Sequence, residues 1–177
     1  MTITEALAEI KTLVKRIQSK REFIETYQFR IDSLKDPLDK DGGSAKAVSE
    51  AQQAVSDLEK RIVLLRSKIA EANSSNTITL EGTELSIENW LIWRREIAPG
   101  QERFLNALAT RLNNARSQIL GQKVSWGGTK TSEDKQVDLV VNLDEAKLNS
   151  DKEKIKNILG QLDGQLSLKN ATIQLAA

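Results

Sequence analysis

The side chains best suited to contact a ligand or a nucleic acid lie close together, in the sequence NWLIWRR at residues 89–95. Tryptophan rings stack on bases and apolar ligands, and arginine adds charge and cation–π contacts. Residues 94–130 carry seven basic and two acidic residues, the kind of excess that a nucleic-acid patch needs. Such tryptophans are more often core residues, and such arginines more often pair with acidic helix faces. The candidate interaction surface consists of Trp90, Trp93, Arg94, Arg95 and Arg103.

Two short patterns resemble ion-binding motifs without meeting their requirements. Asp36, Asp39 and Asp41 precede a glycine, as acidic residues do in a calcium loop, but Glu50 comes too late to be the terminal bidentate ligand. The sequence GGTKT at residues 127–131 lacks the glycine spacing and the following helix of a phosphate-binding loop. We therefore expect a solvated loop at the aspartates and no phosphate site.

The composition excludes several classes of enzyme and metal site. The chain has no cysteine and no histidine, so it can form no disulfide, no ordinary Cys/His zinc site and no histidine-based catalytic relay. With 26 basic and 25 acidic residues, its net charge of +1 argues against wholesale electrostatic binding to nucleic acid or anionic lipid. We expect a non-enzymatic protein that needs no cofactor and no metal.

The sequence shows neither an export signal nor a membrane span. The amino terminus lacks the apolar run of a signal peptide, and nowhere do 18 apolar residues follow one another. We therefore expect a soluble protein without a transmembrane segment, located in the cytoplasm or in a virion.

The elements that position these side chains begin with a long amino-terminal helix. Thr2 and Glu5 have the spacing of a capping box, and the helix is expected to run to about Lys35. Leu7 and Val14 are expected in alternate core positions of its first two heptads. An isoleucine recurs at every seventh position: Ile3, Ile10, Ile17, Ile24 and Ile31.

A second helix is expected from Ser44, as its cap, to Ala72, after the turn-forming residues 36–44. Its small and apolar residues repeat at intervals of three and four, so the two helices are expected to pair as an antiparallel hairpin. The stripe faces the first helix and leaves room for a further chain. The predicted hairpin and oligomer packing residues are Ile10, Ile17, Ile24, Ile31, Val48, Val55, Leu58, Ile62, Leu65 and Ile69.

The region after residue 76 changes its periodicity. Residues 77–80 read as a short extended segment before a turn at Glu81 and Gly82, and Ser86 begins a third helix. Pro99 and the following glycine are expected to interrupt this helix, which restarts at a kink. The buried side of the restarted helix is expected to contain Phe104, Leu108, Leu112, Ala115 and Ile119.

The last third of the chain combines extended segments with a final helix. Residues 123–126 and 135–143 are expected to pair as strands, and Asp144 opens the helix. The predicted fold is therefore mainly α, with a long coiled-coil-like antiparallel hairpin, two further helices and short β segments. The hairpin occupies residues 1–76 and an α-rich region occupies residues 77–177, together forming one continuous body.

The order of these features resembles the septicolysin-like family of small helical proteins. The resemblance rests on EALAEIKTLVKRI at residues 5–17, on ANSSNTITLEGTELSIENWLIWRR at 72–95, on VD at 137–138 and on the spacing LD…N.T..L at 162–175. It departs from the family in residues 121–136. The resemblance implies the helical fold and, through the family name, a toxin, but it implies no catalytic residues.

Three functions are compatible with these features. The first is a structural or assembly protein that acts through helical self-association, or by docking into a larger complex such as a phage virion. The second is a septicolysin-like membrane-active toxin. The third is a nucleic-acid-associated protein that uses the arginines at 94, 95 and 103, which the near-neutral charge makes the weakest of the three.

Overall fold

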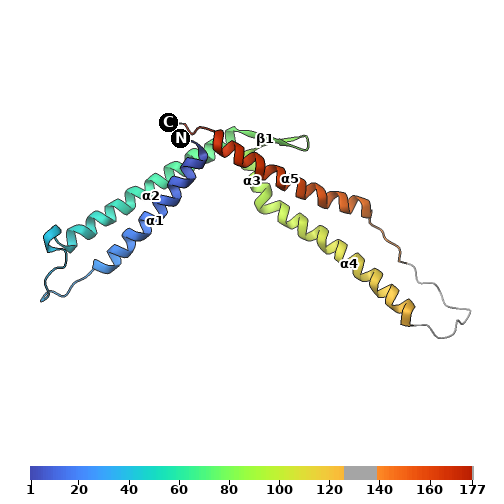
Figure 1. The fold of residues 1–177 in the computed structure, drawn as a ribbon, viewed down its shortest axis with the longest axis horizontal. Coiled ribbons are helices and arrows are strands. Elements are labelled where there is room, and N and C mark those ends of the chain that lie inside the picture. The colour runs from blue at the N-terminus through green and yellow to red at the C-terminus, as the bar shows by residue number, and fades with distance from the viewer. Residues whose placement is uncertain (126–138, 177) are drawn as a thin grey trace, which may run out of the picture. The chain divides into compact units, whose positions relative to one another are not determined.

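The computed structural model describes residues 1–125 and 139–176, which are mainly helical with a small two-stranded antiparallel sheet (Figure 1). The predicted fold class is therefore confirmed. The chain divides into two compact units. The first unit combines Met1–Thr77 with Gln165–Ala177, and the second is Ile78–Gly164.

Helix α1 (Ile3–Tyr27) begins at the predicted capping box. The Thr2 backbone N–H donates to Glu5 Oε2 at 2.8 Å, and the Glu5 N–H donates to Thr2 Oγ1 at 3.2 Å. The prediction that α1 runs to Lys35 was wrong. Helix α2 (Ser44–Ser75) does not cover the segment after Tyr27, where Phe29 and Leu34 are 79% and 60% exposed, so a longer α1 would gain no packing there. Ile31 accordingly lies outside the helix with 64% of its surface exposed, and it takes no part in the hairpin packing.

The hairpin core lies between α1 and α2, as the periodicity predicted. Ile10, Leu65 and Ile69 belong to one buried cluster, with Leu58 and Ile62 packed against it. Of the other predicted packing residues apart from Ile31, Ile17 is buried, and Ile24, Val48 and Val55 are half-buried.

The alternate core positions of α1 differ from those predicted. Ala6 and Leu13 are buried, whereas Leu7 and Val14 remain 38% and 53% exposed. Both pairs border the isoleucine column, one on each side, because a residue three or four positions away lies on the same helix face. Packing against α2 buries Ala6 and Leu13, which follow Ile3 and Ile10 at a spacing of three.

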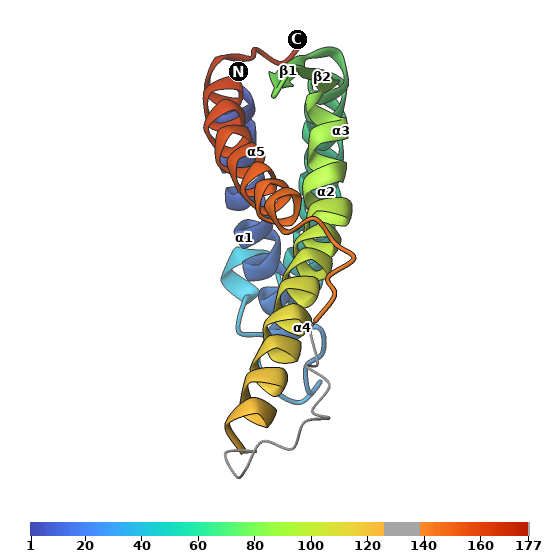
Figure 2. The same cartoon turned by 90° about the vertical axis from the view of Figure 1, so that its right-hand side faces the viewer.

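The two ends of the chain are tied together in the first unit. Thr2 and Gln174 form an antiparallel bridge, and the Leu175 backbone N–H donates to the Met1 carbonyl oxygen at 2.9 Å. Leu175 enters the same buried cluster as Ile10. Figure 2 shows the two termini side by side at the end of the hairpin opposite its loop.

The second unit begins with a β-hairpin of β1 (Thr77–Leu80) and β2 (Thr83–Ser86). Its two turn residues, Glu81 and Gly82, have φ values of 49° and 77°. Positive φ at both positions matches the right-handed twist of paired strands, which is why this two-residue turn closes the hairpin. Ser86 then caps α3 (Ile87–Ile92), as predicted, by accepting a hydrogen bond from the Asn89 N–H at 3.2 Å.

Helix α3 continues through a π-helical turn (Trp93–Ile97) into α4 (Ala98–Ser125). Pro99 lies in the first turn of α4, as predicted for the restarted helix, and the π turn separates this helix from α3. A proline there lacks an N–H and crowds the carbonyl four residues earlier. The π turn, in which the Ala98 N–H donates to the Trp93 carbonyl oxygen, widens the helix just before the proline.

Helix α5 (Glu145–Thr172) begins at the predicted residue, with the Lys147 N–H donating to Asp144 Oδ1 at 3.0 Å. The predicted strands are not formed in the described part of the chain. Residues 123–125 end α4, and residues 139–143 contain no strand. The remaining positions of those two segments, and the GGTKT sequence, lie outside the described residues.

Candidate functional site

The two tryptophans of the predicted interaction surface have different environments. Trp90 is buried, with 4% of its surface exposed, and its Nε1 donates a hydrogen bond of 2.9 Å to the Ile78 carbonyl oxygen. Trp93 is half-buried and packs edge-on against Trp90, with the ring centroids 5.6 Å apart and the planes at 89°. Trp90 is therefore a core residue that supports its neighbour, and Trp93 is the tryptophan that a partner can reach.

The three arginines of that surface are engaged within the chain. Arg94 pairs with Asp163 of α5 at 2.7 Å, and Arg95 pairs with Glu96 at 2.7 Å. The Nε of Arg103 donates to the Pro99 carbonyl oxygen at 3.1 Å. A phosphate would have to compete with these contacts, so the arginines do not form an unoccupied basic patch.

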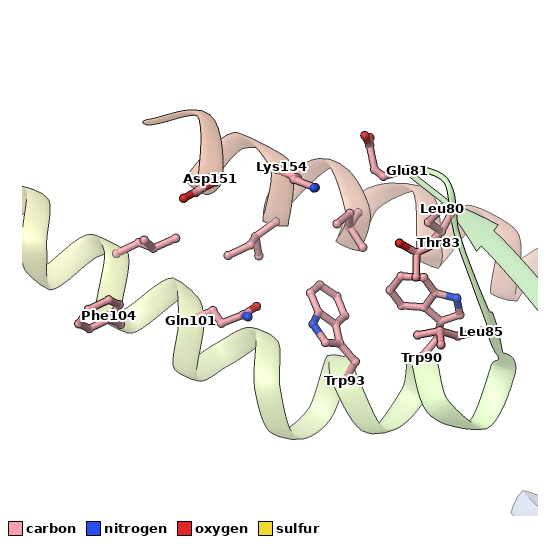
Figure 3. A pocket seen from close by; sticks show the side chains of 13 residues that line it. Leu80, Glu81, Thr83, Leu85, Trp90, Trp93, Gln101, Phe104, Asp151 and Lys154 are labelled. Carbon is pink, nitrogen blue, oxygen red and sulfur yellow. The ribbon is translucent and has the colours of Figure 1, made fainter. Parts of the chain in front are cut away.

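An open groove lies in the second unit between α5 on one side and α3, the π turn and α4 on the other (Figure 3). Its volume is about 520 Å³, and the β-hairpin closes one end. Most of its surface is apolar, from Trp93, Phe104, Leu105, Ile155 and Ile158 among others. A few polar groups stand among them: Glu81, Thr83, Gln101, Asp151 and Lys154.

Two ion pairs connect α5 to the helical segments on the other side of the groove. Arg94 and Asp163 join the π turn to α5, and Arg116 and Glu145 join the far part of α4 to the first residue of α5. These pairs align α4 and α5 as antiparallel neighbours. They are surface pairs, and such pairs contribute little to stability while fixing a register.

The apolar side of α4 is only partly covered by α5. Phe104, predicted to be buried, has 63% of its surface exposed, which corrects that prediction. The rest of the predicted side is half-buried: Leu108, Leu112, Ala115 and Ile119. The facing residues of α5 are buried: Leu148, Ile155, Ile158 and Leu162. The helix pair thus leaves apolar surface of α4 in contact with solvent.

A second, more polar hollow of about 580 Å³ lies on the flank of the α1/α2 hairpin. Val14 and Ile17 line it together with the pair Arg21–Glu59, whose atoms are 2.7 Å apart. On the opposite flank, Arg61 pairs with Glu9 at 2.8 Å. The hydrogen bond from Arg61, with its charge, lowers the pKa of Glu9. Arg21 and Glu59 in this hollow are paired with each other, which makes it a weaker candidate.

The loop between α1 and α2 is closed around Asp36. Its carboxylate accepts hydrogen bonds from the Ser44 hydroxyl, the Ser44 N–H and the Leu38 N–H. These hydrogen bonds, of which that from the Ser44 hydroxyl has the largest effect, lower the pKa of Asp36 to about 2.

The prediction that Ser44 caps α2 needs correction, because Gly43 holds the cap position and Ser44 is the first helical residue. Nowhere in residues 1–125 and 139–176 do three acidic side chains gather in an arrangement that could hold a metal.

The groove residues of α5 were not predicted as a site. Nothing in the local sequence shows that α4 and α5 face each other across an opening. The i,i+3 pair Asp151 and Lys154 beside Ile155 and Ile158 is the available signal, because it puts charge at the edge of an apolar stripe.

Comparison with known proteins gives no family assignment. No family model matches the sequence, no curated protein matches it, and no solved structure matches it. Among the described helices, none has the length and apolar character needed to cross a membrane.

Proposed function

We propose that this protein is a non-enzymatic assembly component, which associates through its helices with copies of itself or with other proteins of a larger complex. The observation that carries the proposal is the uncovered apolar face of α4 beside the groove, where Phe104 is 63% exposed. Removing apolar surface from water is the main driving force of protein association. An apolar groove between helices is also a common docking site for a further helix.

Other features of the chain agree with association. The buried residues of the 32-residue α2 are limited to Ser44, Ala51, Leu65 and Ile69. Helices in such an arrangement gain stability mainly from packing, so a further helical surface would add to it. Long helices with aligned apolar stripes are typical of proteins that assemble.

The geometry supports this function better than nucleic-acid binding. Trp90 is buried and cannot stack on a base, and Arg94 and Arg95 are paired with carboxylates. The septicolysin-like resemblance suggests membrane activity, but no contact or surface among the described residues favours it over association with proteins.

Size-exclusion chromatography with light scattering tests the proposal on the full chain. We expect a mass above the 19.7 kDa of one chain at micromolar concentration, rising with concentration. A monodisperse monomer over the whole range would contradict the proposal. Liposome leakage measured on the same preparation would instead favour the membrane-active alternative.

A further inference from the structure

We propose that the groove between α4 and α5 is the self-association interface, closed by the same face of a second copy of this chain around a two-fold axis. This inference rests on the proposed function and names the surface and the occupant. The partner copy contributes Phe104, and each copy's groove stays incomplete without it.

The first argument is the position of Phe104 relative to the hollow. Figure 3 shows Phe104 toward one end of the groove and Trp93 farther along, beside Trp90, which lies next to the β-hairpin. Along the α5 edge, Asp151 lies between these two rings and the Lys154 side chain lies across from Trp93. A two-fold axis that passes between Asp151 and Lys154 brings Phe104 of one copy over Trp93 of the other, and the reverse. A surface that carries both a protruding ring and a place for it can pair with itself.

The second argument is charge complementarity. Asp151 and Lys154 both line the groove, and neither forms an ion pair with another described residue. The same two-fold axis sets α5 antiparallel to α5 of the second copy, so that each Asp151 faces the second copy's Lys154. One symmetry operation therefore satisfies both the aromatic and the charged contacts, and it does so twice.

The third argument is size. The ion pairs Arg94–Asp163 and Arg116–Glu145 bracket a stretch of about 30 Å, from the helical rise. Two neighbouring helices, each about 10 Å wide, together span about 20 Å, so this face has an area on the order of 600 Å². A standard interface buries about 800 Å² on each partner, so the face suits a dimer that forms at micromolar concentration.

Sedimentation equilibrium of the full chain from about 1 to about 200 µM measures this association, a range that fits the small interface. We expect the wild-type mass to rise toward twice 19.7 kDa. Phe104→Glu places two charges in the aromatic contacts and should weaken the dimer at least about tenfold. Phe29→Glu is the matched control, because Phe29 is exposed in the loop of the first unit and should leave the dimer unchanged. Circular dichroism checks that both variants keep their helix content.

A charge exchange tests the two-fold geometry itself. Asp151→Lys and Lys154→Asp should each weaken the dimer about threefold to tenfold, because each puts like charges opposite one another twice. The double variant restores opposite charges across the axis and should recover the wild-type affinity. The equimolar mixture of the two single variants should also associate more tightly than either variant alone, because the mixed dimer sets opposite charges across the axis; an i,i+3 contact within α5 would not produce this gain.

The outcomes separate the inference from the proposed function. An oligomer that persists unchanged in Phe104→Glu overturns this interface while association itself stands. A monomer at every concentration overturns both. A monomer that instead takes up an apolar dye in a manner abolished by Phe104→Glu overturns the second copy as the occupant and makes the groove a small-molecule site.

Discussion

Trp90 and Ile78 are joined by a buried hydrogen bond of 2.9 Å, from the indole Nε1 to the backbone carbonyl oxygen. The bond ties α3 to β1 and satisfies two polar groups that water does not reach. Trp93 packs edge-on against the fixed ring of Trp90, so the orientation of Trp93 in the groove depends on this bond. Trp90, which was predicted to contact a partner, thus supports Trp93, the tryptophan that a partner can reach.

Loss of the Trp90 hydrogen bond should destabilise the protein. Trp90→Phe keeps an aromatic ring but loses the indole hydrogen bond to the Ile78 carbonyl oxygen, which should lower the free energy of unfolding by about 0.5–1.5 kcal/mol. Urea unfolding followed by circular dichroism measures this change. Trp93→Phe is the control, because it removes an indole from the groove and leaves the Ile78 bond intact. Equal losses in the two variants would contradict the role assigned to the bond.

Two neighbouring leucines of α2 test the seam of the hairpin. Leu65 is 2% exposed in the core cluster, whereas Leu64 is 46% exposed. Leu65→Ala should lower the free energy of unfolding by about 2–5 kcal/mol, because it removes buried methyl groups and leaves a cavity. Leu64→Ala makes the same chemical change on the surface and should cost less than about 1 kcal/mol. Thermal and urea unfolding should rank the two variants in this order, and the reverse order would place the seam on the wrong face of α2.

The loop at the hairpin tip should show a defined response to acid. The folded pKa of Asp36 is about 2, below its ordinary value of 3.8. A lowered folded pKa means that the carboxylate stabilises the loop fully above about pH 4 and loses this effect as the pH falls toward about 2. Asp36→Asn should lower the melting temperature at neutral pH and flatten the pH dependence in that window.

The control for this titration is Asp32→Asn, which removes a fully exposed charge from the same loop. Melting curves of the three proteins at matched ionic strength give the comparison. If wild type and Asp36→Asn lost stability in parallel between pH 4 and pH 2, the hydrogen bonds from Ser44 would have no part in the acid response.

Much of the fold follows from local patterns in the sequence. The capping box of Thr2 and Glu5, the Ser86 cap and the start of α5 at Asp144 all appear where predicted, because each depends on residues within one helical turn. The stripe of α2 also faces α1 as expected, since helical periodicity alone brings its members to one side. Periodicity did not show where α1 ends, because that depends on whether the apolar residues after Tyr27 are covered, and Phe29, Ile31 and Leu34 are exposed.

The candidate site is less predictable from the sequence. The sequence alone determined that Trp90, Trp93 and Phe104 exist on helices with apolar faces, and that histidine and cysteine chemistry is excluded. Only the tertiary structure decided that Trp90 is buried, that Phe104 is exposed, and that Asp151 and Lys154 border the same groove. The physical reason is that burial and ion pairing join residues of different elements, such as Arg94 and Asp163, whereas caps, turns and helix faces are set by neighbours in the chain.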